Sequence, residues 1–327
     1  MATFRFRANR WQARVRRKGN PDLTKTFVTR QDAERWARSA EVDLDRGSYV
    51  NPVEAQRITL GGLIDRYIRE VLPAMKGAKE DGIRLAAMKR NSVAKLSLAS
   101  LTPEAIGKYR DERLRTVAAG TVIRNLAYIS SVINHARREW GITVANPIPL
   151  VRKPTAPKGR DRLLSADELA RLLRALEPTG RRNPWMQPLV QLALETAMRR
   201  GELLSLRWSD IDLSGRTATL WQTKNGDKRV VPLSSRAIAV LQSMPRDIGG
   251  VVFPINGFTV SAAFDRALER AGINDFHFHD LRHMAVTELS KRLPNLIELA
   301  AVSGHRSLKM LQRYYHPNPS ELAAKLG

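Results

Sequence analysis

The sequence predicts a mainly α-helical protein with small β elements, and three observations support this fold class. Most of the 327 residues lie in segments whose apolar side chains recur with helical spacing. Strand-like alternation is confined to the N-terminal fifty or so positions and to one hairpin signal at 216–233. At 43% hydrophobic residues, the chain can bury real cores, which excludes disorder throughout.

Residues 1–55 are expected to form a three-stranded sheet covered by one helix. Trp11, Ala13 and Val15 alternate with polar neighbours, which is typical of a strand with one buried face. The polar side and the following turn carry a basic set: Arg14, Arg16, Arg17 and Lys18. A helical apolar stripe follows, capped by Thr29 and ended by Gly47. We predict that the basic set contacts DNA; a solvated edge that discourages strand pairing is the alternative.

Residues 56–150 show a purely helical pattern. Apolar spacing indicates helices over 60–71, near 79–90, after Thr102 with Pro103 at its first position, and over 123–136 before Gly141. The expected bundle has a basic surface that includes Lys89, Arg90 and Arg124. We predict DNA contact here as well, with an ordinary solvated face as the alternative.

Residues 151–162 are predicted to be a basic linker. Pro154 and Pro157 stiffen this stretch and make it unsuited to a core. Arg152 and Lys153 would allow it to follow a DNA backbone, so that the flanking domains close around a duplex.

Residues 163–327 are expected to form a further domain, in which helices dominate after the capping box of Ser165 and Glu168. The exception is the pair of strand-like runs on either side of Asn225 and Gly226, a strong hairpin signal. Lys224 lies at the mouth of that turn, where a long side chain can reach into a groove without disturbing a core.

Charge and composition restrict the partners. Lys and Arg number 55 against 32 Asp and Glu, and the net charge of +23 favours a polyanion. A ribosomal or generally adhesive protein is the alternative explanation. No apolar run reaches the ~20 residues that span a bilayer, and no cysteine is present for disulfides or thiolate metal sites. The start of the chain lacks the apolar core of a signal peptide, so we expect a cytoplasmic protein.

Several polar residues point to phosphodiester chemistry. Metal-free DNA cleavage needs a nucleophile, cations for the crowded phosphate oxygens, and an acid for the leaving oxygen. An arginine can donate two parallel hydrogen bonds to a phosphate, and a lysine can release a proton when neighbouring cations lower its pKa. The candidates lie in four motifs, in this order: Thr196–Leu203 with Arg199 and Glu202, Thr223–Gly226 with Lys224, His279–His283 with Arg282, and Gly304-His305 with Tyr314 nine positions on.

These motifs resemble the signatures of the tyrosine recombinases, the phage integrase family. The match covers 165–320, and four motifs in order at compatible spacings are highly specific although none is decisive alone. The N-terminal sheet and the helical bundle resemble the arm-site-binding and core-binding domains of the integrase branch, which implies a mixed α/β catalytic domain at 163–327. Ala197 departs from the pattern, because relatives often have Gly there.

The resemblance implies a role for each motif residue. Tyr314 would attack the scissile phosphate and form a 3′-phosphotyrosyl bond, with no metal and no ATP. Arg199 and Arg282 would bind the nonbridging oxygens, and Lys224 would protonate the leaving 5′-oxygen. His279 would assist proton transfer from the tyrosine and His305 would hydrogen-bond the phosphate. Glu202, one helical turn from Arg199, would order the site. The implied partners are double-stranded DNA with core and arm sites, a homotetramer on DNA, and an accessory DNA-bending or directionality factor.

Alternatives remain at two positions and for the function. Lys228 is the alternative to Lys224, and Tyr315 the alternative to Tyr314. A type IB topoisomerase uses nearly the same residues, and a catalytically inactive DNA-binding regulator would share the basic surface. A metal-dependent nuclease is disfavoured because the acids are scattered. Residues 320–326 are expected to form a short apolar helix that docks on a neighbouring protomer or caps its own domain.

Overall fold

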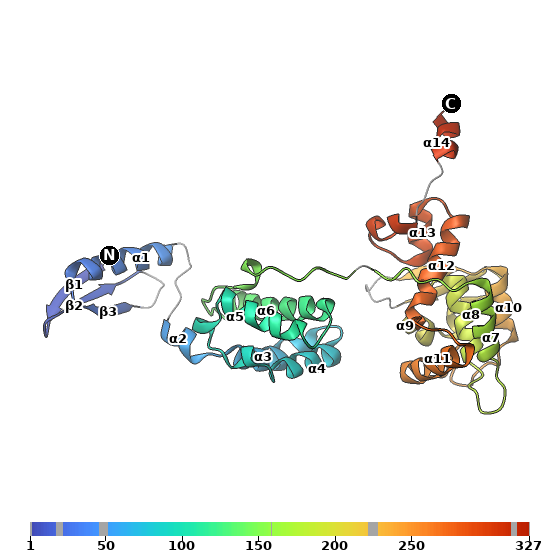
Figure 1. Ribbon diagram of the computed structural model, residues 1–327, viewed down its shortest axis with the longest axis horizontal. Helices are drawn as coiled ribbons and strands as arrows, with labels where there is room; N and C mark the ends of the chain where they lie inside the picture. Colours follow the sequence, from blue (N-terminus) through green and yellow to red (C-terminus); the bar gives the residue numbers. More distant parts are fainter. Residues whose placement is uncertain are drawn as a thin grey trace. The chain divides into compact units, whose positions relative to one another are not determined.

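A computed structural model of the chain describes residues 2–17, 22–45, 52–157, 159–221, 228–314 and 319–326. They fall into two compact units, Met1–Lys158 and Gly159–Gly327, and each is described by itself (Figure 1). The fold is mainly helical, as the sequence predicts, and the described residues form two small three-stranded sheets.

The first unit begins with an antiparallel sheet in the order β1-β2-β3, made of Ala2–Arg7, Arg10–Val15 and Leu23–Phe27. Ala13 and Val15 are fully buried beneath helix α1 (Arg30–Asp45), which covers one face of the sheet (Figure 1). The predicted apolar stripe of α1 is confirmed, because it buries Ala33, Ala37, Ala40 and Leu44. The amide of Asp32 donates to the hydroxyl of Thr29 at the start of the helix.

The rest of the first unit is a helical bundle with its own core. Its helices are α2 (Pro52–Arg57), α3 (Leu60–Glu70), α4 (Ala78–Met88), α5 (Pro103–Leu114) and α6 (Ala119–Glu139). Short 3₁₀ turns connect them: η1 (Leu72–Ala74), η2 (Ser92–Lys95), η3 (Leu98–Ser100) and η4 (Ile148–Leu150). Thr59 and Thr102 cap α3 and α5 through their side chains. All four predicted helices are present: apolar spacing indicates α3, α4 and α6, and the Thr102 cap followed by Pro103 indicates α5.

The second unit contains the remaining helices of the described residues. They are α7 (Ala166–Ala175), α8 (Met186–Thr196), α9 (Arg200–Ser205), α10 (Ser235–Ser243), α11 (Gly257–Ala271), α12 (Phe278–Arg292), α13 (Leu296–Ser303) and α14 (Pro319–Leu326). The 3₁₀ turns are η5 (Trp208–Asp210), η6 (Leu308–Met310) and η7 (Gln312–Tyr314). Ser165 forms the expected capping box with Glu168 at the start of α7.

A small sheet in the order β4-β5-β6 accompanies these helices: Ile211–Asp212, Thr217–Leu220 and Arg229–Pro232. The hairpin of β5 and β6 is confirmed, and its last paired residues are Leu220 and Arg229. The predicted turn at Asn225 and Gly226 lies outside the described residues. Strand β4 has two residues and therefore left no alternation to detect in the sequence.

Two apolar clusters hold the second unit together. The larger one spans α7 to α12 and includes Leu189, Phe264 and Leu281. A smaller one joins Ala197 and Ala285 to Leu299, Leu311 and the ring of Tyr314. The small cluster fixes the end of α8, the middle of α12 and the segment after α13 close to one another. Across the described residues, no helix combines the length and apolar character needed to cross a membrane.

Candidate active site

Arg199 lies in the tight connection between α8 and α9. Helix α8 ends at Ala197, whose left-handed backbone (φ 52°) stops the helix and turns the chain. Because glycine adopts this conformation at no steric cost, the position would also suit a glycine. Arg199 is then the N-cap residue of α9 and Glu202 its third residue. The backbone amide and the Nη1 of Arg199 each donate to the Glu202 carboxylate at 2.8 Å.

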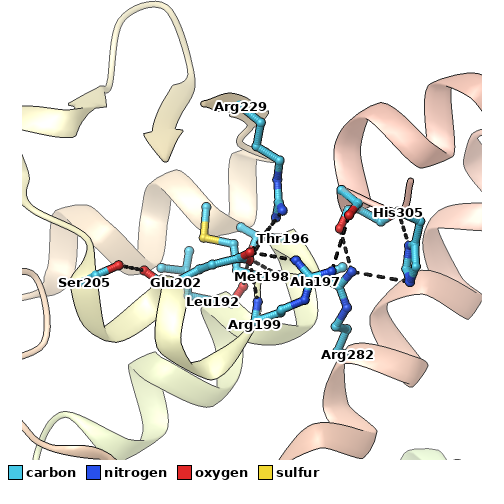
Figure 2. A network of polar contacts seen from close by, with 12 residues as sticks. Leu192, Thr196, Ala197, Met198, Arg199, Glu202, Ser205, Arg229, Arg282 and His305 are labelled. Carbon is cyan, nitrogen blue, oxygen red and sulfur yellow. Dashed lines mark hydrogen bonds and ion pairs between the residues drawn. The ribbon is translucent and has the colours of Figure 1, made fainter. Parts of the chain in front are cut away.

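Glu202 is shared by a second arginine that the sequence analysis did not single out. Arg229, at the start of β6, donates from Nη1 and Nη2 to the two carboxylate oxygens at 3.2 and 3.0 Å. Glu202 is 4% exposed and thus lies between two guanidinium groups, as Figure 2 shows. Arg229 lies on the same face of its strand as Val231, which is fully buried. An arginine on the buried face of the predicted hairpin is the sequence signal that could have identified it.

Charge neutralisation outweighs burial at Glu202. Burial by itself raises the pKa of this carboxyl, but the Arg199 amide and the charges of Arg229 and Arg199 hold it below its usual range. Glu202 is therefore ionised at neutral pH. It fixes the Arg199 guanidinium, whose side chain is 23% exposed, at the surface of the site.

Arg282, on α12, is almost fully buried and ties three segments together. Its Nη1 donates to the carbonyl of Ala197, and its Nη2 donates to the carbonyl of Ser303 at 2.6 Å. The same Nη2 lies 3.4 Å from Nε2 of His305 (Figure 2). Arg199 completes this side of the site, because its Nη2 donates to the carbonyl of Gly304 at 3.4 Å.

The hydrogen bonds define the tautomer of His305. The hydroxyl of Ser303 donates to the carbonyl of Leu299 at 2.6 Å, so its oxygen accepts from Nδ1 of His305 at 2.7 Å. The Nε2 of His305 then carries a lone pair that faces Arg282. Burial and the charges of Arg282, Arg199, Arg229 and His279 lower the pKa of His305 to about 4. The ring is neutral at pH 7.

The site is rich in positive charge, and this charge perturbs Arg282 as well. Burial, followed by repulsion from Arg199, lowers the pKa of Arg282 to about 10, so that it remains charged at neutral pH. Mutual repulsion of this kind is relieved by a bound anion. Arg199 and Arg282, with His305 beside them, therefore place two guanidinium groups where a phosphodiester could be bound.

Tyr314 ends the 3₁₀ turn η7, which packs against α12, the helix that carries Arg282. Its half-buried ring packs in the cluster that contains Ala197 and Ala285. Burial raises the pKa of its hydroxyl, although the charges of Arg313 and Arg282 act in the opposite direction. The hydroxyl lies 2.9 Å from Nδ1 of His283. His283, the last residue of the His279–His283 motif, is therefore in direct contact with Tyr314.

His279 is exposed one helical turn before Arg282, and its charge acts on His305. The structure thus brings Arg199, Glu202, Arg282 and His305 into one hydrogen-bonded network. Lys224 and Tyr315 lie outside the described residues. Lys228, the alternative to Lys224, places its Nζ 4.1 Å from the ring centroid of Trp221.

The basic residues expected to contact DNA are spread over the first unit. Arg14 and Arg16 both bind Asp22, Arg17 binds Asp45, and Lys89 binds Asp65, all with side chains at least 37% exposed. Arg90, Arg124, Arg152 and Lys153 are exposed, and Lys18 lies outside the described residues. Within the described part of the chain, no three His, Asp or Glu side chains are placed to hold a metal ion.

Comparisons with known proteins identify the family of the chain. Residues 162–321 match the model of the phage integrase family. The chain is 41% identical over 282 residues to a shufflon-specific DNA recombinase of Escherichia coli, covering 83% of this chain and 72% of that protein. It is 34% identical over 334 residues to a putative integrase/recombinase of Haemophilus influenzae, covering 98% and 89%.

The chain belongs to the phage integrase family. It is a tyrosine-type site-specific DNA recombinase.

Solved structures of phage integrase family members share the fold. A lambda integrase tetramer bound to a Holliday junction matches with a TM-score of 0.64 and 23% identity, covering 93% of this chain and 95% of that one. The Tn1549 transposon integrase in complex with circular intermediate DNA matches with a TM-score of 0.63 and 15% identity, covering 83% and 99%. The first of these matches includes the N-terminal sheet region, because it covers nearly the whole chain.

Proposed function

We propose that this recombinase cuts and rejoins DNA through a covalent 3′-phosphotyrosine on Tyr314, without metal or ATP. The observation that carries the proposal is the pair of charged arginines, Arg199 and Arg282, held together with the neutral ring of His305 beside a half-buried tyrosine. Preorganised cations of this kind stabilise the charge that develops on a phosphate during displacement.

Arg199 and Arg282 bind the nonbridging oxygens in this proposal. His305 contacts the same phosphate, whose negative charge offsets the repulsion that now lowers its pKa. His279, exposed one helical turn before Arg282, assists proton transfer from the tyrosine. Lys224 protonates the leaving 5′-oxygen, and Glu202 keeps Arg199 in place.

The covalent bond to Tyr314 conserves the energy of the phosphodiester. The 5′-hydroxyl of another strand attacks the phosphotyrosine, restores a DNA linkage and frees the tyrosine. Strand exchange is therefore nearly isoenergetic and has no need of ATP.

In our proposal, the predicted domains of the chain bind different parts of the DNA. Residues 1–55 bind arm sites and 56–150 bind core sites, with 151–162 as a basic linker between them and the catalytic domain at 163–327. The exposed Arg152 and Lys153 support a linker that follows the backbone. The matched lambda integrase is a tetramer on a Holliday junction, which supports a homotetramer on DNA, with α14 docking on a neighbouring protomer.

The reaction would integrate or excise a mobile element, such as a viral genome, in the cytoplasm of a bacterial host. The relatives from Escherichia coli and Haemophilus influenzae support a bacterial setting. An accessory DNA-bending or directionality factor would select the direction.

A nicked duplex that carries the recombination site tests the proposal, because the nick releases the leaving strand and traps the covalent complex. On a denaturing gel, we expect a protein-DNA adduct for the wild type and for Tyr315→Phe, and none for Tyr314→Phe. Tight binding with no adduct for any of the three proteins would contradict the proposal, and so would an adduct that depends on Tyr315.

A further inference from the structure

Among the described residues, His283 contacts the Tyr314 hydroxyl and can accept a proton from it. It follows Arg282 directly on α12, is 15% exposed at its side chain, and places Nδ1 2.9 Å from the tyrosine oxygen. The planes of the two rings are tilted by 56° to each other, and their centroids are 5.1 Å apart. His279, one turn earlier on the same helix, is exposed.

The surroundings of the second ring nitrogen determine the direction of that hydrogen bond. Nε2 of His283 faces the carboxylate of Asp161 at 4.0 Å, which is too long for a hydrogen bond but close enough for electrostatic attraction. A carboxylate on this side favours a proton on Nε2. Nδ1 then carries the lone pair, and the tyrosine hydroxyl donates to it.

Asp161 is itself held in place. Arg313, next to Tyr314, binds the Asp161 carboxylate and donates to the carbonyl of Arg160 at 2.8 Å. The chain before α7 is therefore attached to the turn that carries the tyrosine. This contact keeps the carboxylate on the Nε2 side of His283.

The surroundings of His283 favour a neutral ring. Burial lowers the pKa of His283 most, and the charge of Arg313 lowers it further, while Asp161 and Asp280 act in the opposite direction. The net shift is downward from 6.5. A neutral ring at working pH has its lone pair available, as a general base requires.

We propose that His283 is the general base that activates Tyr314, with Asp161 as its positioning residue. As the tyrosine oxygen attacks phosphorus, its O–H bond breaks and the proton moves to Nδ1 of His283. The new O–P bond forms while the bond from phosphorus to the 5′-oxygen breaks, and that oxygen takes a proton from the acid of the site. In the reverse attack by a 5′-hydroxyl, the imidazolium returns the proton to the tyrosine. The inference rests on the proposed function of Tyr314.

The substitution His283→Asn provides a sharp test, because its amide can keep a hydrogen bond to the tyrosine but cannot accept a proton at neutral pH. We expect single-turnover adduct formation to slow by about 10²-fold or more. Thermal unfolding of the variant is measured alongside, so that a loss of fold is recognised.

Replacing Tyr314 by 3,5-difluorotyrosine tests whether the slow adduct formation of His283→Asn comes from the loss of proton transfer from the tyrosine. This phenol is more acidic and depends less on a base, so it should restore most of the rate that His283→Asn loses. A substrate whose leaving 5′-oxygen is replaced by sulfur should leave the defect unchanged, because it removes the need for the acid and not for the base. Asp161→Asn should show a smaller defect with the same rescue by difluorotyrosine.

The rate should also depend on pH through His283. Wild-type adduct formation should fall in acid, at a pH below the ordinary pKa of histidine, as the ring gains a proton, and His283→Asn should lack that inflection. The inference would be overturned if His283→Asn formed the adduct as fast as the wild type. It would also be overturned if the sulfur substrate, and not difluorotyrosine, restored the rate of His283→Asn. Both outcomes would leave Tyr314 as the nucleophile. Absence of any wild-type adduct would instead refute the proposed function itself.

Discussion

Arg199 and Arg282 perform similar tasks in the proposed mechanism but are held by different contacts. Arg199 is 23% exposed and is oriented by a carboxylate, whereas Arg282 is 6% exposed and donates to two backbone carbonyls. The sequence motif predicts both arginines equally well. It does not distinguish a surface residue from one that also joins α8, α12 and α13.

This difference predicts separate outcomes for two substitutions. Arg199→Ala should slow cleavage by about 3 kcal/mol in activation free energy with little change in DNA affinity. Arg282→Ala should slow cleavage similarly and also lower the free energy of unfolding by roughly 2–4 kcal/mol, because two buried carbonyls lose their donor. Cleavage rates and denaturant unfolding of both variants check this. Equal stabilities for the two variants would contradict the structural role of Arg282.

His305 predicts a pH dependence of stability. Its pKa is about 4 in the folded protein, below the ordinary histidine value of 6.5, so the unfolded chain binds more protons between these values. The stability contributed by the neutral ring is complete above pH 6.5 and is lost as pH falls. Without DNA, we expect His305 to account for a loss of at most about 2 kcal/mol between pH 7 and pH 5. Denaturant unfolding at both pH values measures it, and His305→Gln should show a smaller loss. An identical loss in the variant would refute this assignment.

At the scale of the elements, the residue type at the end of α13 is constrained by both the backbone angle and the neighbouring side chain. Gly304 caps this helix with φ 70°, and its carbonyl accepts from Arg199. A side chain at this position would overlap the guanidinium of Arg229, which is packed directly against it. Both the backbone angle and the close approach therefore require glycine.

Gly304→Ala should consequently disturb both the helix end and the arginine pair. We expect the free energy of unfolding to fall by about 1–3 kcal/mol, with a loss of cleavage because Arg229 must leave Glu202. Gly272→Ala is a matched control, because it also caps a helix with positive φ (64°) but has open space around it. Its cleavage rate should stay close to that of the wild type. Equal cleavage rates for the two variants would contradict the proposed contact.

The elements also show what the sequence could and could not predict. Long amphipathic helices such as α3 and α6 were predictable because their apolar spacing repeats over several turns. Arg229 and His283 were not identified as functional because their importance comes from contacts between distant segments. His283 pairs with a tyrosine 31 positions away, and Arg229 binds a carboxylate 27 positions earlier. Spacing within one helix cannot reveal such pairs.

At the scale of the whole molecule, the charge of +23 predicts binding that weakens steeply with salt. The linker supplies a specific test, since Arg152 and Lys153 are exposed. Replacing both by Ala should reduce the slope of log affinity against log salt by up to about 2, one unit per lost phosphate contact. Lys291→Ala, an exposed lysine paired with Glu288, is the control and should leave the slope unchanged. An unchanged slope in the double variant would remove the linker from the DNA interface.

The central claim is that Tyr314 becomes covalently attached to DNA at the cationic site that Arg199, Arg282 and His305 form. Protease digestion of the trapped adduct, nuclease trimming of the DNA and mass spectrometry of the remaining peptide test it most directly. We predict a 3′-phosphonucleotide on Tyr314. The modification on Tyr315 or another residue, or a DNA 5′-phosphate in the linkage, would contradict the account.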